Sequence, residues 1–120
     1  MGSILSDMES HFKEVDSNYF EQNGFTYEGG DIYQKTMEVE IPIEGTQFSF
    51  NMNLVCRYFD SFVDDYKRFT IYPTQTSLVY ARAILGFETF TFEKLVITRP
   101  TAAEIEAAMQ PVNIVKQITY

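Results

Sequence analysis

The only cysteine of the 120-residue chain, Cys56, stands shortly before three aspartates, Asp60, Asp64 and Asp65, in the stretch FSFNMNLVCRYFDSFVDD. Two kinds of chemistry would use these residue types: a thiolate nucleophile beside a base, and a hard cation held by carboxylate oxygens. A nucleophilic cysteine needs a lowered pKa, usually from a histidine or a helix N-terminus. The only histidine, His11, is predicted in another element, so we interpret Cys56 as a packed thiol.

A metal site has little support in the sequence. One cysteine and one histidine leave too few soft ligands for zinc. Asp60, Asp64 and Asp65 are weak candidates for a hard cation, because their segment lacks the glycine and the alternating ligands of an EF-hand loop. We expect a solvated turn whose carboxylates are balanced by the basic side chains of Lys67 and Arg68, and we expect no bound metal.

The chain also lacks the motifs of common cofactor sites and active sites. It has no glycine-rich phosphate loop, no Gly-x-Ser-x-Gly elbow and no residues for a histidine-based triad. Phe90, Phe92, Lys94 and Val96 share one parity, which predicts a core strand with one long side chain reaching out. Because the net charge is −8, direct nucleic-acid binding is disfavoured. We expect no cofactor and no catalytic residue.

The clearest functional signal is the acidity of the first third. Residues 1–44 hold ten acidic and two basic groups, so they account for the whole net charge of −8. On a strand, Glu38 and Glu40 would share one face about 7 Å apart. The ordinary interpretation is a solubilising surface, and the functional one is a surface that docks on a basic partner. The candidate partner-binding residues are Glu28, Asp31, Glu38, Glu40 and Glu44.

The elements that would position these residues follow from hydrophobic periodicity. Apolar residues at three- and four-residue steps predict an N-terminal amphipathic helix, ended by Asn23-Gly24. Its apolar face comprises Ile4, Leu5, Met8, Phe12, Val15 and Tyr19. The period then changes to two, which is typical of strands. Gly29-Gly30 and Glu44-Gly45 predict turns, and Pro42 predicts an edge or a bulge.

The second half of the chain continues this alternation. The pattern over Phe48 to Tyr58 predicts a long half-buried strand with Cys56 in the phenylalanine layer. Thr101-Ala102-Ala103-Glu104 is a capping box that opens a helix through about Met109. Residues 59–69 fit either a short helix or a strand and turn. Further strands are predicted at Phe69 to Tyr72, Leu78 to Leu85 and Glu88 to Thr98, and a strand or a tail at Ile114 to Tyr120.

Together these patterns predict an α+β fold in one compact domain over residues 1–120. An N-terminal amphipathic helix would pack on a mainly antiparallel sheet of five to six strands, followed by a short C-terminal helix. No internal disulfide is available, and no apolar stretch approaches the roughly 18 residues of a membrane span, so we expect a cytoplasmic protein.

The leading functional hypothesis is a non-enzymatic protein-binding module, a small inhibitor that docks its acidic first third on a basic protein surface. A host-defence or nucleic-acid-binding protein would offer such a groove. The alternative is a structural or assembly subunit that self-associates into a homo-oligomer, and a second alternative is an enzyme with a carboxylate-based site. In size and charge alone, the chain resembles secretion chaperones and mobile-element inhibitors of host defence.

Overall fold

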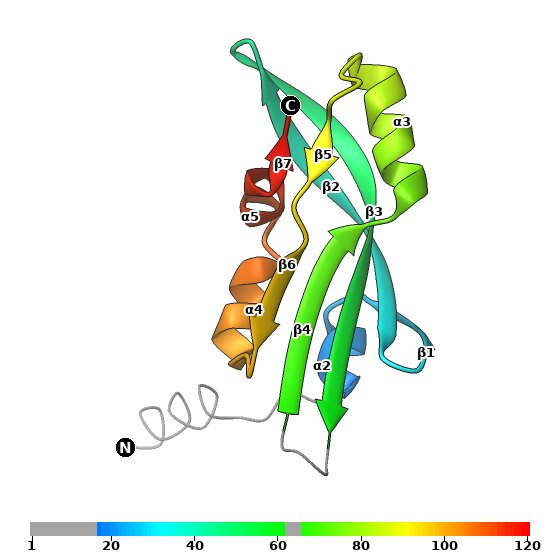
Figure 1. The fold of residues 1–120 in the computed structure, drawn as a ribbon, viewed down its shortest axis with the longest axis vertical. Coiled ribbons are helices and arrows are strands. Elements are labelled where there is room, and N and C mark those ends of the chain that lie inside the picture. Colours follow the sequence, from blue (N-terminus) through cyan, green and yellow to red (C-terminus); the bar gives the residue numbers. More distant parts are fainter. Residues whose placement is uncertain (1–16, 62–65) are drawn as a thin grey trace.

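The computed structural model describes residues 17–61 and 66–120, and its main feature is a five-stranded antiparallel sheet (Figure 1). The strand order is β1-β2-β3-β4-β6, and β5 pairs with β7 in a second, two-stranded sheet. The strands are β1 (Thr26–Gly29), β2 (Ile32–Ile43), β3 (Thr46–Ser61), β4 (Tyr66–Pro73), β5 (Thr91–Phe92), β6 (Leu95–Thr98) and β7 (Ile118–Thr119). The helices are α2 (Ser17–Gln22), α3 (Gln75–Leu85), α4 (Ala102–Ala108) and α5 (Pro111–Lys116). The predicted α+β class and antiparallel sheet are confirmed.

A long hairpin of β2 and β3 is the centre of this sheet. The two strands pair without interruption from Ile32 opposite Arg57 to Ile43 opposite Thr46. The turn between them is Glu44-Gly45, with φ values of 48° and 80°. Two central residues with positive φ match the right-handed twist of the flanking strands. This turn is where the sequence predicted it.

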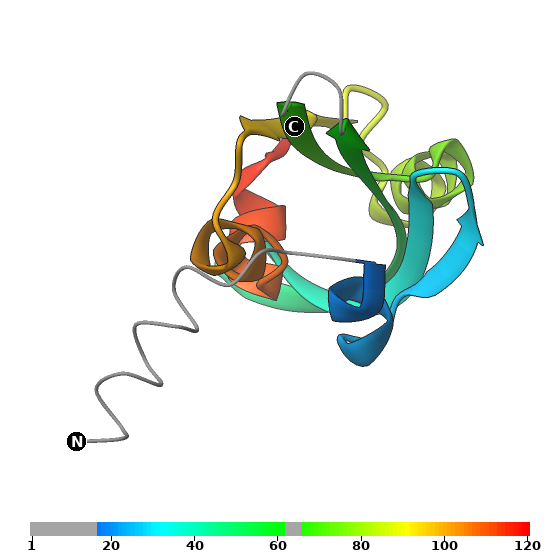
Figure 2. The same cartoon turned by 90° about the horizontal axis from the view of Figure 1, so that it is seen from below.

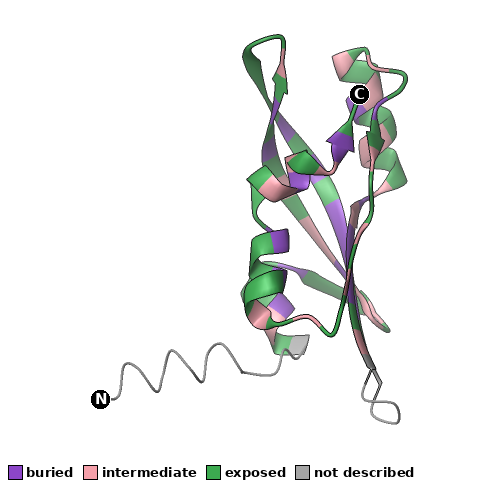
Figure 3. Ribbon diagram, turned by 60° about the vertical axis from the view of Figure 1, so that its left-hand side comes forward, coloured by how far each residue is buried: buried purple, intermediate pink, exposed green. Residues whose placement is uncertain are grey.

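Burial alternates along much of β2 and β3, as their sequences predict, with the buried Val55 as an interruption (Figure 3). One face of β3 is buried at Phe50, Met52, Leu54, Cys56 and Tyr58, although Phe48, near the hairpin turn, remains 43% exposed. The same core contains Tyr33, Val39 and Ile41 of β2 and Phe69 and Ile71 of β4. The sheet curls around this core, and α4 and α5 lie between β6 and β2 (Figure 2).

Helices cover the parts of β2 and β3 that have no neighbouring strand. β4 ends where Pro73 pairs with Leu54, and α3 continues along β3 from there. The backbone of Asn53 accepts a bond from the Thr74 N–H at 2.8 Å and donates one to the Ser77 hydroxyl at 2.9 Å. On the other edge, β1 pairs with β2 only as far as Gln34, and α5 packs along β2.

Pro42 lies at this second edge, as predicted. Its carbonyl accepts a hydrogen bond from the hydroxyl of Tyr120 and therefore points away from β3. The nitrogen of a strand residue points to the same side as its own carbonyl, so the N–H that proline lacks is not needed for the β2–β3 ladder.

The strand predicted at Leu78 to Leu85 is wrong, because this segment is the helix α3. Both helix ends are capped: the Thr74 hydroxyl accepts the Ser77 N–H, and Gly86, with φ 73°, donates its N–H to Arg82. Val79, Tyr80 and Ile84 are exposed. Every residue of this segment except Arg82 is apolar, and several of these apolar side chains do not face the core.

Two other predictions in the second half need correction. The strand predicted at Glu88 to Thr98 is divided between two sheets, and the Glu93 N–H between them donates to Gln117 at 2.8 Å. The strand or tail predicted at Ile114 to Tyr120 begins inside α5, which has Pro111 in its first turn, where proline is well tolerated. The capping box at Thr101 and Glu104 and the helix that it opens are confirmed.

Most of the predicted N-terminal helix lies outside the described residues, including its apolar positions Ile4, Leu5, Met8, Phe12 and Val15. The described helix α2 buries Phe20 fully and is followed by Asn23-Gly24, with Gly24 at φ 86°. In the ambiguous segment 59–69, β3 extends to Ser61 and β4 starts at Tyr66, so the strand alternative holds on both sides of residues 62–65.

Candidate functional site

The first candidate site is a groove of about 510 Å³ between the outer face of β2 and the helix α5, which we name the acidic groove. Glu38 and Glu40 supply its charge, and residues of α5 supply an apolar wall. The lining residues are Glu38, Glu40, Pro42, Gln47, Pro111, Val112 and Val115.

The alternation of side chains along β2 and the packing of α5 against this strand create the acidic groove. Glu38 and Glu40 alternate with the buried Val39 and Ile41, so both carboxylates point outward from β2. The hydroxyl of Ser49, on β3, donates a 2.7 Å hydrogen bond to Glu38 and orients that carboxylate. Ile114 anchors α5 in the core, whereas Val112 on the same helix is 62% exposed. The groove therefore offers charge and apolar surface side by side.

The other predicted partner-binding residues lie elsewhere. Glu44 is exposed in the hairpin turn, and Glu28 is exposed on β1, beside the opposite end of β2. Asp31 precedes β2 and forms an ion pair with Arg57. Asp31 is seven residues, roughly 23 Å, before Glu38 along an extended chain, and Glu28 lies beside the same end of β2, so these two are distant from the groove. Glu44 follows β2 four residues after Glu40 but is not among the lining residues of the groove.

A second site lies on the outer face of β3, β4 and β6, a depression of about 170 Å³ that we name the basic hollow. Three cations from three segments converge on it: Arg57 of β3, Arg68 of β4 and Lys94, which directly precedes β6. The lining residues are Asp31, Arg57, Phe59, Arg68, Thr70, Lys94 and Val96.

The register of the sheet explains the depression. Thr70 pairs with Arg57 on one side and with Val96 on the other, and Phe59 pairs with Arg68 in the next row. The short side chain of Thr70 thus lies among longer ones, which form the rim. Phe59 and Val96 are 45% and 49% exposed and add apolar surface to that rim.

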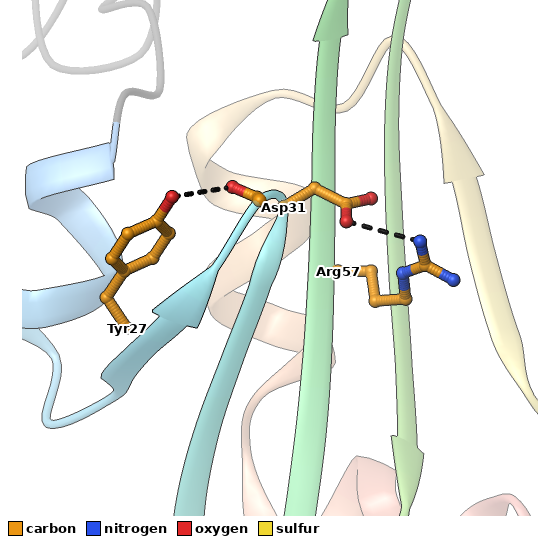
Figure 4. A network of polar contacts seen from close by, with 4 residues as sticks. Tyr27, Asp31 and Arg57 are labelled. Atoms are coloured by element: carbon orange, nitrogen blue, oxygen red, sulfur yellow. Dashed lines mark hydrogen bonds and ion pairs between the residues drawn. The ribbon is translucent and has the colours of Figure 1, made fainter.

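Two of the cations are held in place by neighbours. Arg57 donates to Asp31 at 3.2 Å, as Figure 4 shows beside the hydrogen bond from Tyr27 to Gly30. The hydrogen bond that Arg57 donates to Asp31, then the charge of Asp31, and to a smaller extent Tyr72 raise the pKa of the Arg57 guanidinium. The Lys94 ammonium lies 4.5 Å from the centroid of the Tyr72 ring, at cation–π distance.

The sequence carried a partial signal for the basic hollow. The parity of β3 placed Arg57 outward, but the shared face predicted for Phe90, Phe92, Lys94 and Val96 is wrong. Phe90 is fully buried and Phe92 lies in the small sheet, whereas Lys94 and Val96 line the hollow. The break between β5 and β6 resets the parity, so only the three-dimensional register brings Lys94 to Arg57 and Arg68.

The residues around the cysteine are placed as follows. Cys56 is fully buried, as its parity predicted. Burial, and to a lesser extent the charge of Asp31, raise the pKa of the Cys56 thiol, so it is protonated at neutral pH. Asp60 of β3 lies opposite Lys67 of β4 in the strand register. Asp64 and Asp65 lie outside the described residues. In the described part of the chain, no three His, Cys, Asp or Glu side chains come together as a metal site.

Along residues 17–61 and 66–120, the helices are all too short or too polar to cross a membrane. Comparisons of the chain with protein-family models, with curated proteins and with solved structures found no match.

Proposed function

We propose that this protein is a non-enzymatic protein-binding module whose acidic groove binds a basic segment of a partner, and that it inhibits the partner by occupying that segment. One observation carries the proposal: Glu38 and Glu40 lie across the groove from the apolar wall of α5. A segment with both lysine or arginine and apolar side chains complements the two walls. The charges would set on-rate and register, and the apolar contact would supply affinity.

The groove is tested with a short fluorescent peptide of alternating lysine and leucine, compared with one of alternating lysine and serine. We expect the leucine peptide to bind more tightly, because it fits both walls. In the Glu38→Lys/Glu40→Lys variant, its affinity should fall by about tenfold or more, because two attractive charges become repulsive.

The matched control is Glu88→Lys/Glu93→Lys, which makes the same charge change at two exposed positions outside the groove. An equal loss of affinity in both double variants would show that the peptide responds to net charge alone, and the proposal would fail. Val112→Ser should lower the affinity of the groove for the leucine peptide and leave its affinity for the serine peptide unchanged.

Self-association is the second candidate function, favoured by the opposite charges of the acidic groove and the basic hollow on one chain. A groove of one copy on the hollow of the next would be a head-to-tail contact, which propagates into rings or filaments. Light scattering during size-exclusion chromatography tests it: an oligomer that dissociates as salt rises supports the contact. A monomer at high protein concentration and low salt would count against it.

A further inference from the structure

The basic hollow concentrates positive charge on a chain whose net charge is −8. Arg57, Arg68 and Lys94 line it, and among the lining residues that the structure describes Asp31 is the one carboxylate. Like charges that converge on one depression repel one another, and the folded state tolerates this arrangement at a cost. An anion bound among them would remove that repulsion.

The cations also have the chemistry and the order that an oxyanion needs. Two are arginines, whose planar guanidinium groups match phosphate and carboxylate oxygens with paired N–H donors. Asp31 orients Arg57 at 3.2 Å, and the Tyr72 ring lies 4.5 Å from the Lys94 ammonium. Side chains that are already placed lose less conformational entropy when a ligand binds.

The size of the hollow restricts the ligand. Its volume of about 170 Å³ is below the roughly 300–1,000 Å³ of sites that enclose a drug-sized molecule, so it fits one charged group and not a whole ligand. Three cations favour a phosphate dianion over a singly charged carboxylate. A long polyanion would meet the net charge of −8, so a small phosphorylated molecule is favoured over a nucleic acid.

The rim indicates what else that molecule carries. Phe59 and Val96 line the same hollow and are each nearly half exposed. A flat apolar group attached to the phosphate could pack against them, as bases pack against aromatic side chains on sheet surfaces. We propose that the basic hollow binds the phosphate of a small phosphorylated ligand whose planar, mostly apolar group packs against Phe59 and Val96. A mononucleotide has this chemistry and is the probe.

The test is isothermal titration of the full chain with adenosine monophosphate, inorganic phosphate and adenosine. The monophosphate should bind most tightly, inorganic phosphate more weakly, and adenosine not measurably. Arg68→Gln/Lys94→Gln should lower the affinity for adenosine monophosphate by about tenfold or more, because it removes two charge-assisted donors. Arg99→Gln/Lys116→Gln removes the same net charge at exposed positions outside the lining and should leave the affinity unchanged.

Phe59→Ala separates the two halves of the proposal. This variant should lower the affinity for adenosine monophosphate and leave the affinity for inorganic phosphate unchanged. Equal affinities for both ligands, unchanged by Phe59→Ala, would overturn the assignment of the planar group. Absence of binding at millimolar concentration, or equal losses in the two double variants, would overturn the site itself. Because Glu38 and Glu40 do not line the hollow, these outcomes are independent of the peptide experiment on the acidic groove.

Discussion

The acidic groove and the basic hollow lie on the outer face of the same curved sheet, but they are built differently. The hollow consists mostly of side chains on paired strands, whose spacing is fixed by the β-ladder. One wall of the groove is α5, a helix of 6 residues whose N-cap, Gln110, makes no side-chain capping bond. A helix this short has little stability of its own and depends on its packing. We therefore expect the hollow to be the rigid site and the groove to be the adaptable one.

The largest expected effect concerns that packing. Ile114→Ala should lower the free energy of unfolding by about 2–4 kcal/mol, because Ile114 is almost fully buried and anchors α5. Peptide binding at the acidic groove should be lost while nucleotide binding at the basic hollow persists. Urea unfolding and the two binding assays measure these changes.

Val112→Ala on the same helix is the control for stability, since Val112 is 62% exposed, and it should change the unfolding free energy by less than about 0.5 kcal/mol. Equal losses of binding at both sites in Ile114→Ala would contradict the difference in construction, because the hollow would then also depend on α5.

The next effect lies in the core that supports both regions. Burial raises the pKa of the Cys56 thiol in the folded chain, so at alkaline pH the unfolded chain loses this proton first. Stability should therefore fall as pH rises through the unfolded thiol pKa, by about 1 kcal/mol between about pH 7.5 and pH 9.5. Denaturant unfolding at several pH values measures this slope.

In Cys56→Ala this part of the alkaline slope should disappear, although the variant is less stable at every pH because it leaves a cavity. The comparison is therefore between slopes and not between absolute stabilities. Identical slopes in the two proteins would show that the thiol does not contribute to the pH dependence.

The smallest effect on stability is expected at the ion pair beside the hollow. Asp31→Asn removes a partly exposed salt bridge, so the thermal midpoint should shift by no more than about 2 °C. Loss of this carboxylate from the described lining should raise the affinity of the hollow for adenosine monophosphate by about threefold. Peptide binding at the acidic groove should not change. A fall in nucleotide affinity would instead show that orienting Arg57 is the more important role of Asp31.

The sequence predicted the first half of the fold better than the second for a physical reason. Between residues 25 and 61, alternation and turn residues agree, and the β2–β3 hairpin is made of local contacts. In α3 the sequence is apolar from Leu78 to Leu85 except at Arg82, and the structure caps this segment as a helix at Thr74 and Gly86. A short continuous apolar run does not distinguish a buried strand from a helix by periodicity alone.

The candidate sites were predictable in part. Glu38 and Glu40 follow from strand parity alone, and the structure places them together as expected. The apolar wall of the groove was not predictable, because α5 is distant in the sequence and its packing on β2 depends on tertiary structure. The basic hollow likewise depends on the register of β6 against β4, which a single sequence does not specify.

The arrangement of these walls also has a consequence for synthesis of the chain on the ribosome. All strands that carry the basic hollow have been made once Thr98 emerges, and they pair mainly with neighbours in the sequence. The acidic groove must wait for α5, and its closure joins segments about seventy residues apart, which is slow compared with hairpin formation. In a nascent chain, the strands that line the basic hollow would therefore be able to pair before α5 completes the acidic groove.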